Sequence, residues 1–247
     1  MPRMTDLLAA VSDRDRELHR RHAMLLFVLG LCSFVCCCTY LGRRMETGRH
    51  DYRFLIWNLT LAWAPLIFAT IAHWAFVARG LVGRRLLILG CLTLWLLFFP
   101  NAPYLVSDLK HLAVPRRGVP LWFDSVMVGS FVLTGVMTGF ASLVLVHDLA
   151  RRRFGAGGGW TIITLASAAS GFAVYLGRFV RLNSWDVFTR PMWSLDLIFD
   201  QVTVSTLLPK TLVTSGLYTT FILLGYVTIL TLSHVAAATR VESARAK

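Results

Sequence analysis

Six long runs of apolar residues constrain this chain more than any other feature of its sequence. They cover roughly residues 24–41, 54–77, 86–105, 121–147, 160–181 and 212–234. Each run can cross the ~30 Å hydrocarbon layer of a membrane as a helix that rises about 1.5 Å per residue. No run shows the alternation of barrel strands, and a helix satisfies its own backbone groups in lipid. The sequence therefore predicts an all-α fold, a polytopic bundle of transmembrane helices with about six spans.

The composition and the charge distribution agree with an apolar surrounding. Hydrophobic residues make up 56% of the 247 residues and charged residues only 15%, against about 25% charged residues in an average soluble domain. The net charge of +12 comes from short basic clusters between the apolar runs, such as Arg84-Arg85 and Arg151–Arg153. Such clusters are typical of loops that flank a membrane. We therefore expect membrane lipids as partners and no nucleic acid.

The chain divides into a polar leader at 1–23, a six-span membrane domain at 24–236 and a tail at 237–247. Of the 25 Lys and Arg residues, 14 fall on the side of the two termini and 11 on the opposite side. Because short basic loops are retained in the cytoplasm, this bias predicts that both termini are cytoplasmic.

The third apolar run ends in a break, within "LLFFPNAPYLVSDLKHL" (96–112). Residues 86–99 supply about 21 Å of helix, roughly 9 Å less than the hydrocarbon thickness. Pro100 and Pro103 then interrupt the helix around Asn101, at a depth where irregular backbone is tolerated inside protein or beside water. Interrupted segments of this kind mark binding sites in transporters. The alternative is an ordinary interfacial turn in a locally thinned bilayer.

A short amphipathic helix is expected after the break. Tyr104, Asp108 and His111 would share one face at the spacing i, i+4, i+7. Asp108 and His111 could supply two metal ligands, but a zinc site needs at least three from protein. We therefore assign no metal site and expect the acid to pair with an arginine.

The segment "YLGRFVRLNSWD" (175–186) closes the fifth run with two arginines. Arg178 and Arg181 lie at i and i+3, one turn after Tyr175, and an arginine near hydrocarbon must reach water or a partner. A guanidinium group binds carboxylate or phosphate through paired hydrogen bonds. Asn183 and Asp186 have the spacing of a capping box. The arginines predict either an anion site or ion pairs with nearby aspartates.

The six spans gather most of the unusual polar residues on one side, which we expect to be the outer side. Asp124 belongs here because a carboxylate in the first turn of a helix meets the positive end of the helix dipole. The candidate ligand-binding residues are Asn58, Asn101, Tyr104, Asp108, His111, Asp124, Tyr175, Arg178, Arg181, Asn183, Trp185 and Asp186. The opposite side carries a second group that raises haem or metal binding as an alternative: His73, His147, Asp148 and His234.

Two other patterns concern packing and the membrane surface. The sequence after Pro191 places Met192, Leu195, Phe199 and Val202 on one stripe, which predicts an amphipathic helix on the outer membrane surface before the last span. Small residues at a spacing of four predict close helix packing within the chain, in the pairs Gly135/Gly139 and Ser167/Gly171.

Three of these segments together resemble one protein family. The runs "FFPNAPYLVSDLKHL", "WNLTLAWAPL" and "YLGRFVRLNSWD" are similar to the signature of an uncharacterised bacterial family of multi-spanning membrane proteins, the domain of unknown function 1361. The similarity covers most of the chain beyond the leader. It implies a multi-pass protein of the bacterial inner membrane and carries over no reaction and no catalytic residue.

Three functions stay open from the sequence. The paired arginines and the interrupted helix favour binding or transport of a polar or anionic ligand, or of a lipid headgroup, in an outward-facing polar cavity. A structural or accessory subunit of a membrane complex would use the same groups as internal ion pairs. A membrane-embedded hydrolase or transferase, metal-dependent or not, would use the acidic group and its histidine, namely Asp108, His111, Asp124 and Asp186. No cofactor follows from the sequence.

Overall fold

The computed structural model describes residues 4–78, 82–113, 118–182, 184–204 and 206–245. Within these ranges the chain is helical and contains no strand, which confirms the predicted all-α class. Five helices there are long and apolar enough to cross a membrane: Arg20–Thr47, Arg53–Val77, Arg84–Ala113, Leu121–Val180 and Leu208–Thr239. The protein is therefore a multi-pass membrane protein.

The leader and the first span form one uninterrupted helix, α1 (Met4–Thr47). The expected boundary at residue 23 is not a break in this helix, because no proline interrupts the chain there. Gly48, with φ at 65°, ends α1. The chain then enters α2 (Arg53–Val77), which keeps Pro65 within its length.

The third apolar run becomes three consecutive segments: α3 (Arg84–Phe98), α4 (Asn101–Tyr104) and the 3₁₀ helix η1 (Leu105–Ala113). Phe99 and Pro100 keep right-handed helical dihedral angles between α3 and α4, so the chain does not reverse. Pro100 and Pro103 lack the N–H groups that an α-helix needs. The predicted break is therefore a change of helix type, and the segment after it is a 3₁₀ helix where we expected an α-helix.

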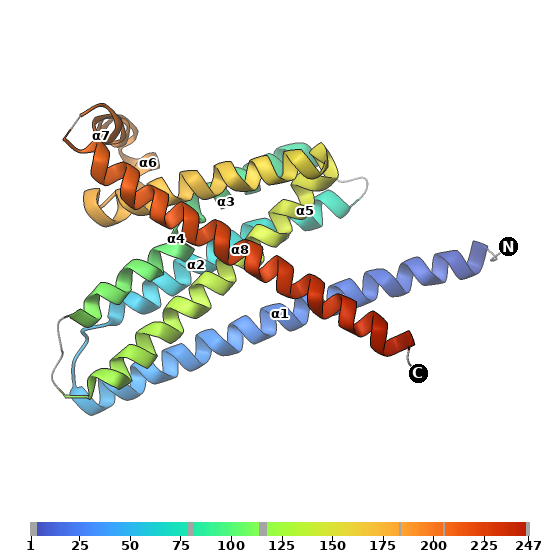
Figure 1. Ribbon diagram of the computed structural model, residues 1–247, viewed down its shortest axis with the longest axis horizontal. Coiled ribbons are helices and arrows are strands. Elements are labelled where there is room, and N and C mark those ends of the chain that lie inside the picture. The colour runs from blue at the N-terminus through green and yellow to red at the C-terminus, as the bar shows by residue number, and fades with distance from the viewer. Residues whose placement is uncertain (1–3, 79–81, 114–117, 183, 205, 246–247) are drawn as a thin grey trace.

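The fourth and fifth predicted spans form a helical hairpin, α5 (Leu121–Tyr175) (Figure 1). Gly155 has φ 76° and ψ 179°, a conformation open almost only to glycine, and the chain reverses there. The rings of His147 and Trp160, on the two arms, lie 4.8 Å apart between centroids. The glycine-rich stretch 151–160 is helical on both sides of this one residue.

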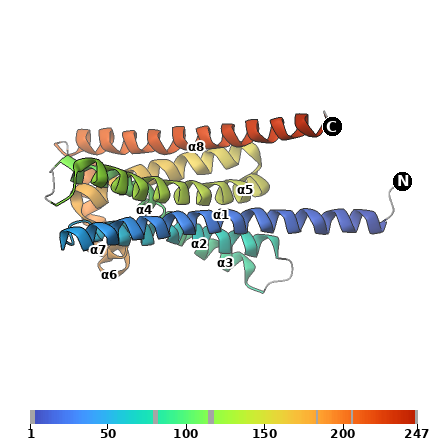
Figure 2. The same ribbon diagram turned by 90° about the horizontal axis from the view of Figure 1, so that it is seen from below.

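Four elements follow the hairpin: the π-helical turn η2 (Leu176–Val180), α6 (Asp186–Thr189), α7 (Pro191–Thr203) and α8 (Leu208–Arg245). With α5 counted as two arms, the chain crosses the bundle six times. Figures 1 and 2 show both termini at one end, which we call the terminal end. The opposite end holds η2, α6 and α7, and we call it the α7 end.

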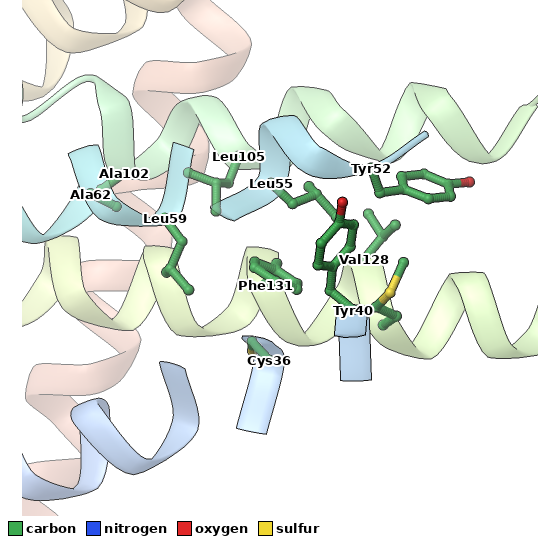
Figure 3. Close-up of a cluster of buried hydrophobic side chains, with 11 residues drawn as sticks. Cys36, Tyr40, Tyr52, Leu55, Leu59, Ala62, Ala102, Leu105, Val128 and Phe131 are labelled. Atoms are coloured by element: carbon green, nitrogen blue, oxygen red, sulfur yellow. The ribbon is translucent and has the colours of Figure 1, made fainter. Parts of the chain in front are cut away.

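A core of buried side chains joins the first two helices to the start of α5 (Figure 3). Cys36 comes from α1, Leu55 and Leu59 from α2, and Phe131 from α5, and all four are buried. Leu105 joins them from η1, so the irregular third span is packed inside the protein at this level. This packing holds the start of η1 in place beside α2 and α5.

The small-residue pairs mark close contacts within the chain, as predicted. A Cβ atom added at Gly139 would lie 2.6 Å from the Cβ atom of Ala102, so α5 and α4 approach closely only because this residue is glycine. A Cβ atom at Gly171 would overlap the backbone oxygen of Ser215 in α8. Both seams therefore fix the position of the segments that carry the candidate site.

Candidate functional site

Asp108 is the carboxylate at the centre of the first polar network at the α7 end. Its side chain is 1% exposed, and Asn58 of α2 donates a hydrogen bond from Nδ2 to its Oδ2 at 2.7 Å. A 3₁₀ helix repeats every three residues, so His111 follows Asp108 on the same face. The ring of His111 lies 4.5 Å from that of Phe54, one turn before Asn58. η1 therefore presents both predicted site residues to α2.

Arg178 of η2 reaches the same carboxylate from a different helix. Its Nη1 lies 3.6 Å from Oδ1 of Asp108, and its Nη2 donates to the backbone oxygen of Ser107 at 2.8 Å. Nη1 also donates to the hydroxyl of Tyr104 at 3.4 Å. A guanidinium group has five N–H bonds, and its side chain here is 11% exposed. Arg178 thus keeps N–H donors for a further acceptor after its hydrogen bonds to Ser107 and Tyr104 are made.

Lys110 and Arg181 bring two further cations to Arg178. Lys110 lies within electrostatic range of both arginines, and Lys110 and Arg181 are exposed. Arg181 ends η2 with φ at 63°, where the backbone leaves the helix. In the described part of the chain, no carboxylate lies within ion-pair distance of Lys110 or Arg181. We call Lys110, Arg178 and Arg181 the cationic cluster.

Asp124 belongs to a second network, with a partner that the sequence analysis missed. Arg43 of α1 donates from Nε to Oδ1 of Asp124 at 2.6 Å and from Nη2 to Oδ2 at 3.2 Å. The two side chains are 1% and 2% exposed, and the guanidinium also covers the ring of Tyr52 at 4.6 Å. Arg43 follows the expected end of the first span, where a basic residue is typical of a loop, but α1 extends past it. Asp124 is therefore a buried structural anion, and a ligand does not need to satisfy it.

Asn101 connects the end of α3 to the segment before α6. Its Nδ2 donates to the backbone oxygen of Phe98 at 2.9 Å and lies 3.4 Å from Oγ of Ser184. The neighbouring Trp185 meets Trp57 of α2 edge to face, with 6.3 Å between ring centroids. Asn101 and Trp185 thus hold the α6 segment in place next to the cationic cluster and take no direct part in it.

Tyr175 anchors α7. Its hydroxyl donates to Oε1 of Gln201 at 2.9 Å, and both side chains are buried. Asp186 begins α6 and is half-buried, and it has an interaction partner. Asn183, which we predicted as its capping partner, lies outside the described residues. The structure therefore brings together Asn58, Tyr104, Asp108 and Arg178 from the predicted set, with Arg181 next to them.

The described residues hold no group of three or more His, Cys, Asp or Glu side chains placed to bind a metal ion. At the terminal end, His73 lies 3.2 Å from Asp148, and His147 bonds to the hydroxyl of Tyr226 at 2.8 Å. His234 is exposed on α8. These histidines contact protein groups on separate helices, so nothing in their arrangement favours the haem or metal alternative.

The fold and the site define a class: a multi-pass α-helical membrane protein with buried arginine–aspartate networks at one end of its bundle. Within that class, the chain belongs to a family described as protein of unknown function, DUF1361, which matches residues 57–225. The matched region contains every residue of the network around Asp108, whereas Arg43 precedes it. No curated protein and no solved structure matches the chain.

Proposed function

We propose that this protein binds an anionic group at the cationic cluster, on the outward side of a bacterial inner membrane. The observation that carries the proposal is the charge arrangement at the α7 end. Lys110, two residues after Asp108, lies within electrostatic range of Arg178 and Arg181, and Asp108, the carboxylate that faces Arg178, is buried and already accepts a hydrogen bond from Asn58. Cations held together repel each other, and an anion between them removes that repulsion.

The geometry of Arg178 suits this role. Its bonds to Ser107 and Tyr104 hold the guanidinium group before a ligand arrives, so less side-chain entropy is lost on binding. A held guanidinium group offers paired N–H donors to phosphate or carboxylate oxygens. Lys110 and Arg181 add charge that attracts an anion over a longer range. The ligand class is therefore a phosphate or a carboxylate.

The outward orientation follows from the basic residues. The terminal end carries 14 of the 25 Lys and Arg residues, and cytoplasmic loops are the more basic ones in inner-membrane proteins. Both termini are then cytoplasmic, and the cationic cluster faces the outer side. A ligand binds from that side, and binding is the first step of transport if the protein also moves its ligand.

A structural role in a membrane complex is the second candidate, because the Arg43–Asp124 pair is internal and fully buried. In that case the cationic cluster would contact an acidic residue of a partner protein. A stoichiometric partner that co-purifies with the wild-type protein, and is lost when Lys110 and Arg181 become glutamine, supports this candidate. Purification of a stable protein without any partner contradicts it.

The anion proposal is tested by thermal unfolding of the purified protein in detergent, with and without inorganic phosphate. We expect phosphate to raise the unfolding midpoint of the wild type. The double variant Lys110→Gln/Arg181→Gln removes two exposed cations and leaves the buried network in place, so it should lose most of this shift. The matched control is Arg44→Gln/Arg53→Gln, which removes two other exposed cations from the same end. Equal shifts in both double variants would contradict the proposal.

A further inference from the structure

The helix next to the cationic cluster exposes both apolar and acidic side chains. α7 buries the polar residues Ser194 and Gln201, which lie two turns apart. It exposes the predicted apolar stripe of Met192, Leu195, Phe199 and Val202, with the carboxylates of Asp196 and Asp200 beside it. An amphipathic helix of this kind is favoured at a membrane surface, where its apolar stripe enters an apolar medium and its charges stay at the polar boundary. The medium available at this position is the acyl-chain region of the bilayer.

Aromatic residues place this end of the bundle at the headgroup level. Trp57, Trp122, Trp185 and Trp193 are all exposed near it, and tryptophan collects where hydrocarbon meets the polar headgroups. Arg190 faces the ring of Trp193 at 6.0 Å from the centroid. The α7 end therefore lies at the boundary between the headgroup layer and the hydrocarbon layer of the membrane.

Packed side chains connect the segment that carries Arg181 to α7. Leu182, the residue after Arg181, packs with Tyr175 and with Ile198 of α7. Lys210, at the start of α8, places its Nζ 3.9 Å from the ring centroid of Phe179, next to Arg178 in η2. A molecule bound at the cationic cluster therefore has an apolar, membrane-facing helix next to it.

We infer that the anion taken by the cationic cluster is the phosphate of an anionic phospholipid, whose acyl chains lie along the exposed apolar side of α7. This inference rests on the proposed function and adds the source of the anion. A soluble phosphate would use only the cations and would gain nothing from α7. A phospholipid gains both contacts, because it carries a phosphate and acyl chains in one molecule.

The test compares three additives on the full-length protein in detergent: phosphatidylglycerol, phosphatidylcholine and glycerol phosphate, each titrated against the thermal unfolding midpoint. We expect phosphatidylglycerol to raise the midpoint at lower concentrations than the other two. In Lys110→Gln/Arg181→Gln its apparent affinity should fall about tenfold or more, since each charge-assisted contact contributes roughly that factor. Arg44→Gln/Arg53→Gln should keep the wild-type response.

A second pair of variants tests the acyl-chain contact. Leu195→Ser/Phe199→Ser removes two exposed apolar side chains of α7, and Leu86→Ser/Leu89→Ser removes two on α3, away from the cluster. Only the α7 variant should lose the advantage of phosphatidylglycerol over glycerol phosphate. A wild-type protein that responds equally to both compounds overturns the lipid inference and leaves the anion site standing. If neither phosphatidylglycerol nor glycerol phosphate raises the midpoint, the anion site and the lipid inference are both overturned. If Lys110→Gln/Arg181→Gln responds to phosphatidylglycerol as the wild type does, the response is general lipid solvation, and the lipid inference is overturned.

Discussion

At the scale of single residues, the pair of Arg43 and Asp124 is the most constrained feature of the protein. Two hydrogen bonds join the groups, and both are shielded from solvent. Taking two charges out of water costs several kcal/mol for each ion, so the pair is stable only while both partners are present. Without Arg43 the carboxylate of Asp124 would lose both of these hydrogen bonds, whereas without Asp124 the guanidinium group would keep its 3.9 Å contact with Asp51.

We expect Arg43→Gln to lower the free energy of unfolding by about 3–5 kcal/mol, because it leaves the carboxylate of Asp124 buried and alone. The double variant Arg43→Leu/Asp124→Leu should recover most of that loss, since it removes both charges together. Thermal unfolding in detergent, combined in a double-mutant cycle, measures the coupling. Arg44→Gln is the matched control, because Arg44 is exposed and exposed positions change stability by about 0.5 kcal/mol or less. Additive single effects would show that the pair is not coupled.

Some residues of the site could be predicted from the sequence, and the reason is their cost in lipid. Arg178 lies in an apolar run and Asp108 three residues after one, where a charge needs a partner, and the structure pairs them. Arg43 could not be predicted in the same way, because it stands among arginines next to the expected end of a span. Nothing in its neighbours distinguishes a buried arginine from one that reaches water, and only the continuation of α1 to Thr47 does so.

At the scale of elements, the close contact of α5 with α8 depends on one glycine. An added Cβ atom at Gly171 would overlap the backbone of α8, whereas one at Gly129, in the same hairpin, would meet open space. An alanine at Gly129 therefore tests helix propensity alone, whereas an alanine at Gly171 tests helix propensity and packing against α8 together.

Gly171→Ala should destabilise the protein by about 1–3 kcal/mol, because α8 must move away from α5. Gly129→Ala should be neutral or stabilise by up to about 1 kcal/mol, since alanine favours the helix. Thermal unfolding of both variants under one condition checks the pair. If Gly171→Ala unfolds at the same temperature as Gly129→Ala, the close approach of α5 and α8 is wrong.

The elements themselves were predictable to different degrees. Long apolar runs identify spans because length and hydropathy decide insertion, and all six runs lie in helices that cross the bundle. The helix type of η1 was not predictable, because two prolines disfavour an α-helix without selecting a replacement. That difference changes which residues share a face: Leu105, Asp108 and His111 follow one another in η1, and Tyr104 is set off from them. Asp108 and His111 therefore both face α2, and Tyr104, in α4, still contacts the same arginine as Asp108.

At the scale of the whole molecule, six crossings place the two termini at one end and the cationic cluster at the other (Figure 1). A bundle with this path has one orientation in which the more basic end remains in the cytoplasm. The orientation decides whether the anion site meets lipid of the outer or the inner leaflet.

Reporter fusions check this orientation. We expect a fluorescent protein to be fluorescent when fused after the last residue or inserted at Gly83, which lies at the terminal end. Alkaline phosphatase inserted at Gly118, just before α5, should be active, because α5 begins at the α7 end. The reverse pattern of activities would place the cationic cluster in the cytoplasm, and the positive-inside bias would then have failed for this chain.

The 3₁₀ form of η1 also determines how far the third span reaches. A 3₁₀ helix rises about 2.0 Å per residue and an α-helix about 1.5 Å, so the nine residues of η1 extend about 4–5 Å further than the same residues would as an α-helix. The apolar part of this span alone is too short for the bilayer. The stretched segment adds reach without added residues, and it carries Asp108 and Lys110 to the level where Arg178 leaves α5.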